Sequence, residues 1–364
     1  MRSALRVIGA VCVKDLRLAL TERVFLVIGV IIPVNFLFLF SLFALTGGEA
    51  PIAVVMQGQG PLARQFVSSL EHAHSFQVHV MSTADAERQL QAGRIVGVLT
   101  VPGGFDDDLR AGRRIELPVE VNNLQVDFTN DIRRAVPLAI TSFYAQAFPD
   151  QVVVQAREVD IQAGDTGYIP YLAVSIVVAG MFVEGLLQSV VLTAREYEES
   201  TIKELELSPA SRWAVALGKV AAGLVLTAAA AAIVTAVVVF VVGVHPVHPL
   251  EVMLYGVLMM VPAVALGVLV GTLLKRRQAA IPLALGSFLP LFFLSGPFGP
   301  PNWGGTAVIS LVSPLTYAIA LFQHAFHGYL TAQTPLAVDV AVLVGFAVAA
   351  VVAATAVLRR GMMA

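Results

Sequence analysis

Six long apolar stretches constrain this chain more than any other feature of its sequence. They cover Val24–Leu45, Tyr168–Thr193, Trp213–Gly243, Leu250–Leu274, Ala279–Gly296 and Leu336–Leu358. A helix of about 20 apolar residues crosses the roughly 30 Å hydrocarbon core of a bilayer, where every backbone polar group must be hydrogen-bonded internally. A mean hydropathy of +0.80 and a charged fraction of 13% also indicate a bilayer as the main solvent. The sequence therefore predicts a polytopic α-helical membrane protein with six transmembrane helices.

The fifth of these stretches has an interrupted pattern. Pro282 and Pro290 lie within it, and the run GPFGPPNWGG, which cannot form a continuous helix, follows from Gly296. We therefore expect a broken or tilted helix at this position.

The segment before the first stretch, residues 1–23, is amphipathic. On a wheel of 100° per residue, Arg2, Arg6, Lys14 and Arg17 fall within an arc of about 120° that the apolar side chains largely avoid. This pattern predicts a helix that lies in the membrane interface with its basic face toward anionic headgroups. Cys12 is the one cysteine of the chain, so no internal disulfide can form, and we expect a small buried side chain rather than a reactive thiol.

The short segments between the apolar stretches are alternately rich in basic residues and free of them. The basic residues are Arg2, Arg6, Lys14, Arg17 and Arg23 at the N-terminus, then Arg195, Lys203, Arg212, Lys219, Lys275, Arg276, Arg277, Arg359 and Arg360. The intervening segments 244–249 and 297–335 carry neither lysine nor arginine. Because short basic loops stay in the cytoplasm, both termini, including the tail 359–364, are predicted to be cytoplasmic. Residues 46–167 are then extracytoplasmic.

This inserted segment, residues 46–167, has the pattern of a small α/β domain. Runs typical of strands lie at 52–57, 76–82, 96–102 and 114–123, and helical periodicity lies at 62–72 and 83–93. A longer helical segment, 128–148, is interrupted by Pro137, and 152–161 reads as a returning strand. The run Asp106–Asp108 lacks the spacing of a calcium loop and is expected to form the charged first turn of a helix.

The chain carries no ATP-binding or catalytic signature. The Gly218-Lys219 pair lacks the earlier glycine and the following Ser or Thr of a phosphate-binding loop. Motifs of the G-x-S-x-G and H-E-x-x-H type are also absent from the sequence. We therefore expect a protein that is not an enzyme, without catalytic residues and without a cofactor of its own.

Two H-x-x-H pairs, His245 with His248 and His324 with His327, are candidate metal ligands. Zinc requires a third ligand and usually a fourth, and only Glu251 lies near the first pair in the sequence. We therefore expect ordinary interfacial histidines and no metal site.

Glu184 is an acid in the middle of the second stretch. A carboxylate in hydrocarbon is unfavourable by several kcal/mol unless it is paired or hydrated. Two interpretations remain open for it, a hydrogen bond between helices or a place in the translocation path.

The loop after the second stretch, residues 194–212, combines high charge with an apolar edge. Ile202, Leu205 and Leu207 form that edge, with Thr201 as a candidate helix cap and Pro209 as a stop. The pattern predicts a short amphipathic helix that serves as a docking surface, although a solvated connector is the alternative.

In this loop the sequence resembles the ABC-2 family of ATP-binding-cassette transporter permeases. The matching residues are Arg195, Glu196, Thr201, Ile202, Leu205, Ser208, Pro209, Ser211, Arg212, Gly218 and Lys219, with Ser200 where the family usually has glycine. Further matches are Pro102, Gly104, Phe105, Leu109 and Gly112, similar to the extracytoplasmic domain of the drug-exporter branch, and Ser313–Ile319 before the last stretch. The order of the elements agrees along essentially the whole chain.

The resemblance implies the permease of a multidrug-type exporter in a prokaryotic plasma (inner) membrane. The permease would form a homodimer, bind two copies of a separate ATPase that holds ATP and Mg²⁺, and export a hydrophobic or amphipathic small molecule or lipid. The residues implied in ATPase coupling are Glu196, Glu198, Glu199, Thr201, Ile202, Lys203, Glu204, Leu205 and Pro209, beside the interfacial Arg6, Lys14 and Arg17. The family also implies re-entrant helices within residues 297–335.

Two other functional classes are alternatives to an exporter permease. A membrane receptor or assembly factor could bind a partner through the α/β domain without transport, and a neighbouring ATPase gene would argue against it. A proton-driven transporter working through Glu184 is disfavoured because inverted repeats are not evident. Nothing in the sequence indicates nucleic-acid binding.

Overall fold

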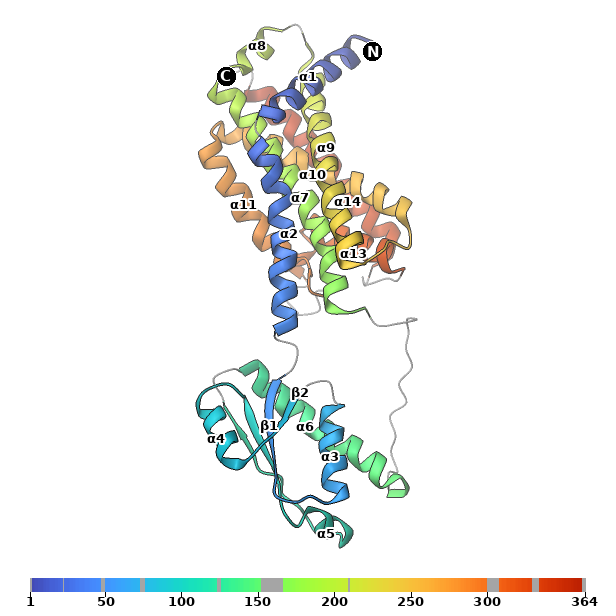
Figure 1. Ribbon diagram of the computed structural model, residues 1–364. Coiled ribbons are helices and arrows are strands. Elements are labelled where there is room, and N and C mark those ends of the chain that lie inside the picture. Colours follow the sequence, from blue (N-terminus) through green and yellow to red (C-terminus); the bar gives the residue numbers. More distant parts are fainter. Residues whose placement is uncertain are drawn as a thin grey trace. The chain divides into compact units, whose positions relative to one another are not determined.

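The computed structural model describes residues 2–21, 23–46, 50–72, 76–122, 126–151, 166–208, 210–299, 308–328 and 334–361. It separates into two compact units, one made of residues 1–41 with 162–364 and the other of residues 42–161. We call them the helical unit and the α/β unit (Figure 1).

The helical unit is built from long apolar helices. Its elements are α1 (Arg2–Thr21), α2 (Arg23–Thr46), α7 (Tyr168–Glu198), α8 (Ile202–Leu207), α9 (Arg212–Val237) with its π-helical continuation η2 (Val238–Val242), α10 (Pro249–Leu274), α11 (Arg277–Leu294), α13 (Pro314–His327) and α14 (Leu336–Gly361). Among the described residues, five helices are long and apolar enough to cross a membrane, namely α7, α9 with η2, α10, α11 and α14. The chain is therefore a polytopic α-helical membrane protein.

The first apolar stretch of the sequence coincides with α2. Its apolar part among the described residues, Gly29–Leu42, is shorter than the other five helices. A sixth span at α2 therefore stays a prediction.

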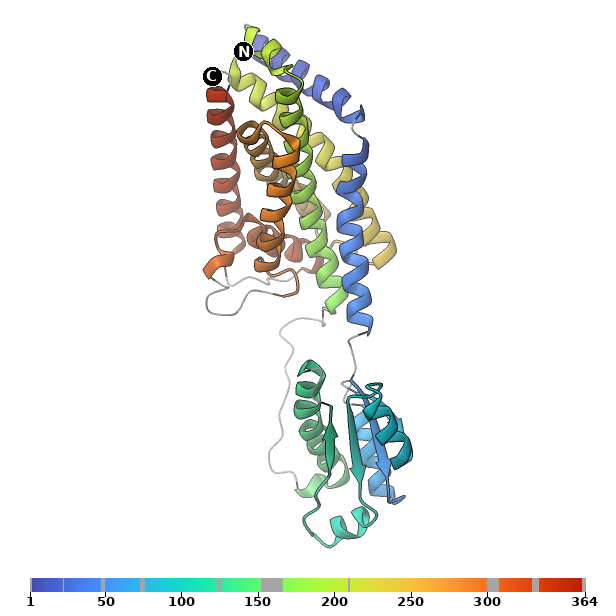
Figure 2. The same ribbon diagram turned by 90° about the vertical axis from the view of Figure 1, so that its left-hand side faces the viewer.

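Helix α7 forms the centre of the helical unit, and its most apolar 18 residues are buried throughout. Helices α9, α10, α11 and α13 pack around it, and in Figure 2 the orange α11 runs beside the green α7. Gly267 and Gly271 of α10 form a G-x-x-x-G pair against α7. A Cβ atom at Gly267 would lie 2.4 Å from the carbonyl oxygen of Leu186, so only glycine lets the two backbones approach this closely.

Proline interrupts neither of the two helices in which the sequence indicated a break, whereas a tilt, the alternative for the fifth stretch, stays a prediction. Helix α11 contains Pro282 and Pro290 and is nevertheless one continuous helix of 18 residues rather than a broken one. Helix α6 likewise continues through Pro137. A proline removes one backbone hydrogen bond and bends a helix, but the hydrogen bonds on either side can keep it helical.

The α/β unit contains β1 (Ala50–Met56), α3 (Pro61–Glu71), β2 (Phe76–Val80), α4 (Thr83–Gln91), β3 (Gly97–Val101), α5 (Phe105–Arg110), β4 (Val119–Val121), α6 (Val126–Ala147) and η1 (Pro149–Gln151). The sheet has the order β2-β1-β3-β4, in which β1 is parallel to β2 and β3, and β4 is antiparallel to β3. The strand expected at 152–161 lies outside the described residues.

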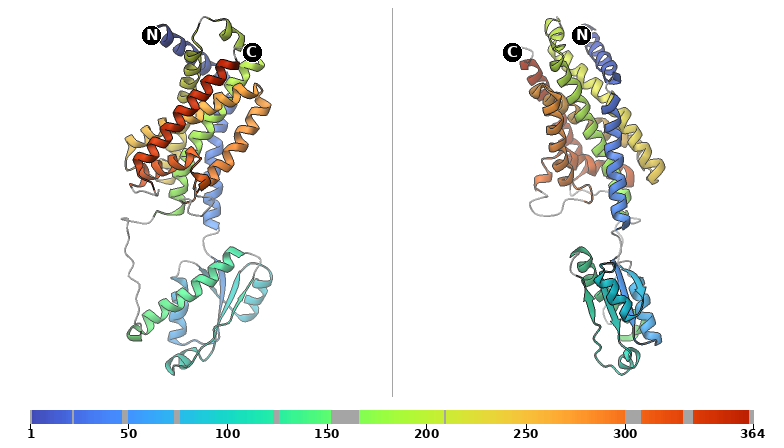
Figure 3. Two further views of the ribbon diagram at one scale, coloured as in Figure 1. Left: turned by 180° about the vertical axis from the view of Figure 1, so that it is seen from behind. Right: turned by 60° about the vertical axis from the view of Figure 1, so that its left-hand side comes forward.

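The strand β1 shows why this sheet needs helices on both faces. Ile52 and Val54 pack with Phe66 of α3 and Phe143 of α6, while Ala53 and its alternate neighbour Val55 pack beside α4. Successive side chains of a strand point to opposite faces, so the apolar run of β1 requires two covers. Figure 3 shows the long α6 crossing one face of the sheet.

The acidic run of α5 has a structural role. The Asp106 carboxylate accepts hydrogen bonds from the backbone N–H groups of Leu62 and Ala63, both at 2.9 Å, and so caps α3. Asp108 accepts a hydrogen bond from Arg113 Nε at 2.7 Å. The run lies in the first turn of α5, as the sequence predicts.

Candidate functional site

Helices α1, α7 and α9 meet at one end of the helical unit, which we call the α1 end. Both chain termini and α8 lie at this end (Figure 1). Arg212 at the start of α9 donates to the carbonyl oxygen of Arg359 near the end of α14, at 3.5 Å. The basic ends of several helices therefore gather around α1.

Four charged side chains, Lys14, Asp15, Glu196 and Lys219, form an ion cluster between these helices. Lys219 Nζ lies 2.5 Å from Glu196 Oε2 and 3.6 Å from Asp15 Oδ2. Lys14 Nζ lies 2.7 Å from Asp15 Oδ1 and also pairs with Glu196. Asp15, Glu196 and Lys219 are each at most 3% exposed. Two cations balance two carboxylates, so the cluster joins three helices without leaving a buried net charge.

Gly218 explains how α1 comes close enough to complete the ion cluster. A Cβ atom at this position would lie 2.7 Å from Val11 Cβ and 3.0 Å from the carbonyl oxygen of Ile8. The Gly218-Lys219 pair therefore has two tasks, since the glycine admits α1 and the lysine pairs with Asp15. This is the pair that ends the family pattern recognised in the sequence.

The end of α7 is tied to two other helices. Arg195 donates to Thr21 of α1 at 3.1 Å and to Glu199 Oε1 at 2.7 Å. Glu198 accepts hydrogen bonds from the backbone N–H of Arg277 at 2.7 Å and from its Nε at 2.6 Å. Its carboxylate thereby caps the start of α11.

The turn between α7 and α8 explains the family preference for glycine. Ser200 has a φ of +58°, in the left-handed region where a side chain is unfavourable. A glycine would fit this turn without strain.

A groove of about 770 Å³ separates α1 from the end of α7 and α8. Its lining residues are Gly9, Ala10, Val13, Lys14, Arg17, Leu18, Thr21, Glu199, Thr201, Glu204 and Leu205. The lining thus combines apolar side chains with both signs of charge. At the end of α8, Leu207 is 88% exposed.

The residues predicted for ATPase coupling do not form one site. Glu199, Thr201, Glu204 and Leu205 line the groove together with Lys14 and Arg17, whereas Glu196 belongs to the ion cluster and Glu198 contacts α11. Ile202 is buried, Lys203 and Arg6 are exposed, and Pro209 lies outside the described residues.

The expected cap of α8 is wrong. The Thr201 side chain accepts no hydrogen bond from the helix N–H groups, and instead its hydroxyl donates to the Glu196 carbonyl oxygen at 3.4 Å.

Asp15 and the buried role of Lys219 were not predicted. Asp15 lies on the apolar side of the helical wheel of α1, between Val11 and Ile8. An acid on the apolar face of a basic helix was the signal that a buried cation lies opposite it.

Cys12 lies on α1 beside this cluster and is partly buried. Burial, followed by the nearby Asp15 carboxylate, raises the pKa of the Cys12 thiol. A raised pKa keeps the side chain in the less reactive thiol form.

Glu184 lies against the glycine of a neighbouring helix. A Cβ atom at Gly29 of α2 would lie 1.4 Å from Glu184 Oε2, so the carboxylate fills the space that this glycine leaves. Glu184 is 1% exposed, and within the described part of the chain neither of its oxygens has a hydrogen-bond partner. Gln188, one turn later, is also buried without a partner there.

Comparison with known proteins identifies the family. A sequence profile of the ABC-2 family transporter proteins matches residues 23–356. The chain belongs to this family. Its similarity extends to the inner membrane transport permease YhhJ of Escherichia coli K12, at 23% identity over 85% of this chain and 86% of that protein. The probable multidrug ABC transporter permease YbhS of the same strain is 24% identical over 80% of each chain.

The protein is therefore the permease subunit of an inner-membrane ABC transporter, and an ABC ATPase is its partner.

Proposed function

We propose that this permease exports a hydrophobic or amphipathic compound and that the groove between α1 and α8 receives its ATPase. The observation that carries the proposal is that the groove borders the ion cluster. Lys14 belongs to both, lining the groove and pairing with Glu196 of α7. A partner bound in the groove would therefore contact Lys14, which pairs with the central helix α7.

The exposed side chains of α8 fit a docking role. Leu207 projects into solvent, and Glu204 is exposed on the groove side of the same helix. Exposed apolar residues among charged ones are typical of protein interaction surfaces. Closure of two ATPase subunits on ATP and Mg²⁺ would then move α8 and α1 of each permease in a homodimer.

The charge distribution supports a cytoplasmic position for the α1 end. The arginines and lysines of the short loops lie at the ends of α7, α9, α10, α11 and α14 that join or flank this end. Under the positive-inside rule this end and both termini face the cytoplasm, and the α/β unit lies outside it.

In this proposal Glu184 belongs to the translocation path of the cargo. It lies near the middle of α7, and no described side chain satisfies its carboxylate. Intramembrane acids without a structural partner commonly line transport paths. Glu184→Gln should reduce efflux at least about tenfold while the ATPase still co-purifies. Unchanged efflux would show that Glu184 is not part of the translocation path.

The docking proposal is tested with charge reversal on the groove. Glu199→Lys combined with Glu204→Lys should abolish most ATPase co-purification and efflux, because both carboxylates line the groove. Glu87→Lys, an exposed site on α4, serves as the matched control and should change neither. Intact efflux and co-purification in the groove variant would refute the docking surface.

The cargo class has its own test. The complex reconstituted in lipid vesicles should show ATPase stimulation by lipophilic compounds and none by small hydrophilic ones. Inward accumulation rather than efflux of the stimulating compounds would reverse the proposed direction.

A further inference from the structure

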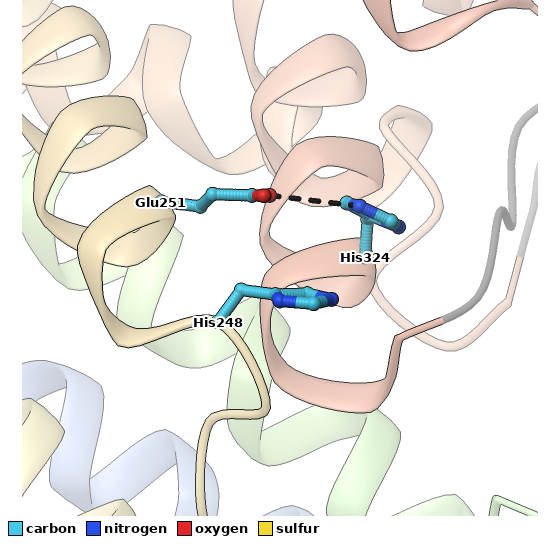
Figure 4. A group of neighbouring side chains, drawn as sticks. All are labelled: His248, Glu251 and His324. Atoms are coloured by element: carbon cyan, nitrogen blue, oxygen red, sulfur yellow. Dashed lines mark ion pairs between the residues drawn. The ribbon is translucent and has the colours of Figure 1, made fainter.

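The other end of the helical unit, which we call the α13 end, holds a cluster of metal-binding side chains. His248 and Glu251 lie at the start of α10, and His324 lies in the last turn of α13. One possible ligand atom from each of the three residues lies within 4.8 Å of the others. Figure 4 shows the three side chains directed into the space between the two helices. We call them the histidine cluster.

The cluster combines one histidine from each H-x-x-H pair of the sequence. His245 is exposed, with Nδ1 3.0 Å from the carbonyl oxygen of Gly243, and takes no part in it. His248 and Glu251 are three residues apart, which places them on one side of α10. The third ligand comes from a distant part of the chain, so neither pair alone indicates the site.

Backbone hydrogen bonds hold the two helix ends together. The N–H of His248 donates to the carbonyl oxygen of Ala325 at 2.8 Å, and the N–H of Val247 donates to that of Phe326 at 3.3 Å. These bonds fix the start of α10 beside the last turn of α13. Ligands held in this way lose little conformational freedom when an ion binds.

A neighbouring tyrosine orients the carboxylate. Tyr255 donates its hydroxyl proton to Glu251 Oε2 at 3.1 Å, and His324 Nε2 lies 3.5 Å from the same oxygen. The His248 and His324 rings are stacked with centroids 5.4 Å apart. Metal ligands commonly have such an outer partner, which orients the ligand and tunes its basicity.

We propose that the histidine cluster binds a divalent first-row transition-metal ion of the Zn²⁺ class. Two imidazoles and one carboxylate are a donor set for such ions, and water can complete a tetrahedral sphere. Calcium and magnesium prefer shells of six or more oxygens, which two histidines do not supply. The bound ion would clamp α10 to α13 through side chains as well as backbone.

The experiment measures metal binding by the full-length protein in detergent or nanodiscs. A Cys12→Ser background removes the one thiol, and chelator-treated protein is titrated with Zn²⁺ and with Co²⁺ as a spectroscopic probe. We expect one tight equivalent per chain, visible bands typical of a nitrogen and oxygen Co²⁺ site, and a higher melting temperature with Zn²⁺. His248→Ala and His324→Ala should each weaken binding at least about tenfold.

Three further variants distinguish a specific metal site from nonspecific binding to histidines. Tyr255→Phe keeps all three ligands and should weaken binding about 10-fold or more, as loss of an outer partner does. His245→Ala and His79→Ala lie outside the cluster and should leave the tight equivalent intact. Tight binding that survives His248→Ala with His324→Ala, or no binding above that of this double variant, would overturn the proposal.

Discussion

The two ends of the helical unit use the same kinds of side chains differently. At the α1 end, Asp15, Glu196 and Lys219 are almost fully buried, and the more exposed Lys14 balances the charge of the ion cluster. At the α13 end, the Glu251 side chain is 35% exposed and that of His324 is 17% exposed. A buried, balanced cluster fixes one arrangement of helices, whereas a partly open cluster retains room for an ion. The comparison suggests a rigid α1 end and an adjustable α13 end.

Of the substitutions considered, removal of Lys219 should lower the stability of the α1 end the most. Lys219→Met leaves two carboxylates with only the more exposed Lys14, and loss of one partner from a buried pair costs about 3–5 kcal/mol. Thermal unfolding of the purified permease measures the loss, and ATPase co-purification should fall with it.

Lys203→Met is the matched control for this change. Lys203 is exposed on α8, so its replacement should leave the melting temperature within error. Adding Glu196→Gln to Lys219→Met should recover part of the loss, because it removes one uncompensated charge. A Lys219→Met protein as stable as the control would show that the ion cluster does not hold the α1 end together.

Gly218→Ala should push α1 away from α9 while leaving all four charged side chains of the ion cluster in place. The added methyl group would lie 2.7 Å from Val11 Cβ, and overpacking of this kind costs about 1–3 kcal/mol. The melting temperature and cysteine cross-linking between α1 and α9 measure the displacement. Gly286→Ala in α11 meets no atom within 4 Å and should be neutral or slightly stabilising. Equal effects at the two glycines would mean that close approach at Gly218 is unimportant.

The difference between the two ends also shows what the sequence can predict. Span length and apolar content are properties of one continuous segment, so five of the spans could be recognised without knowing any contact. The alternating patterns of the α/β unit are local in the same way. The two prolines of α11 indicated a possible break that the helix does not have, because the hydrogen bonds of its other residues keep it continuous.

The two clusters could not be predicted in full because each depends on contacts between distant segments. Asp15 and Lys219 meet only once α1 packs on α9, and Gly218 is what permits that packing. His248 and His324 meet only through the pairing of the loop before α10 with the end of α13. The residues themselves were visible in the sequence, but their partners were not.

Ser200→Gly should stabilise the α1 end, in contrast with Lys219→Met and Gly218→Ala. The left-handed φ of Ser200 is unfavourable by about 1–2 kcal/mol for a residue with a side chain, and the greater freedom of glycine in the unfolded chain offsets part of this. We expect a net gain of about 1 kcal/mol or less in the melting experiment. Ser287→Gly within α11 should instead destabilise, and a Ser200→Gly protein that melts at a lower temperature would contradict the strained turn.

His324→Gln in metal-free protein should have the smallest effect, and this is the closest test of the comparison. The pair of His324 with Glu251 spans 3.5 Å, requires a protonated imidazole and is partly exposed, so it contributes about 0.5 kcal/mol. The melting temperature should therefore change little without metal, in contrast with Lys219→Met. With Zn²⁺ present, the difference between His324→Gln and the unmodified protein should widen, because the bound ion stabilises only the intact site. A large loss in the absence of metal would mean that the α13 end is held as rigidly as the α1 end, and the distinction between the two would fail.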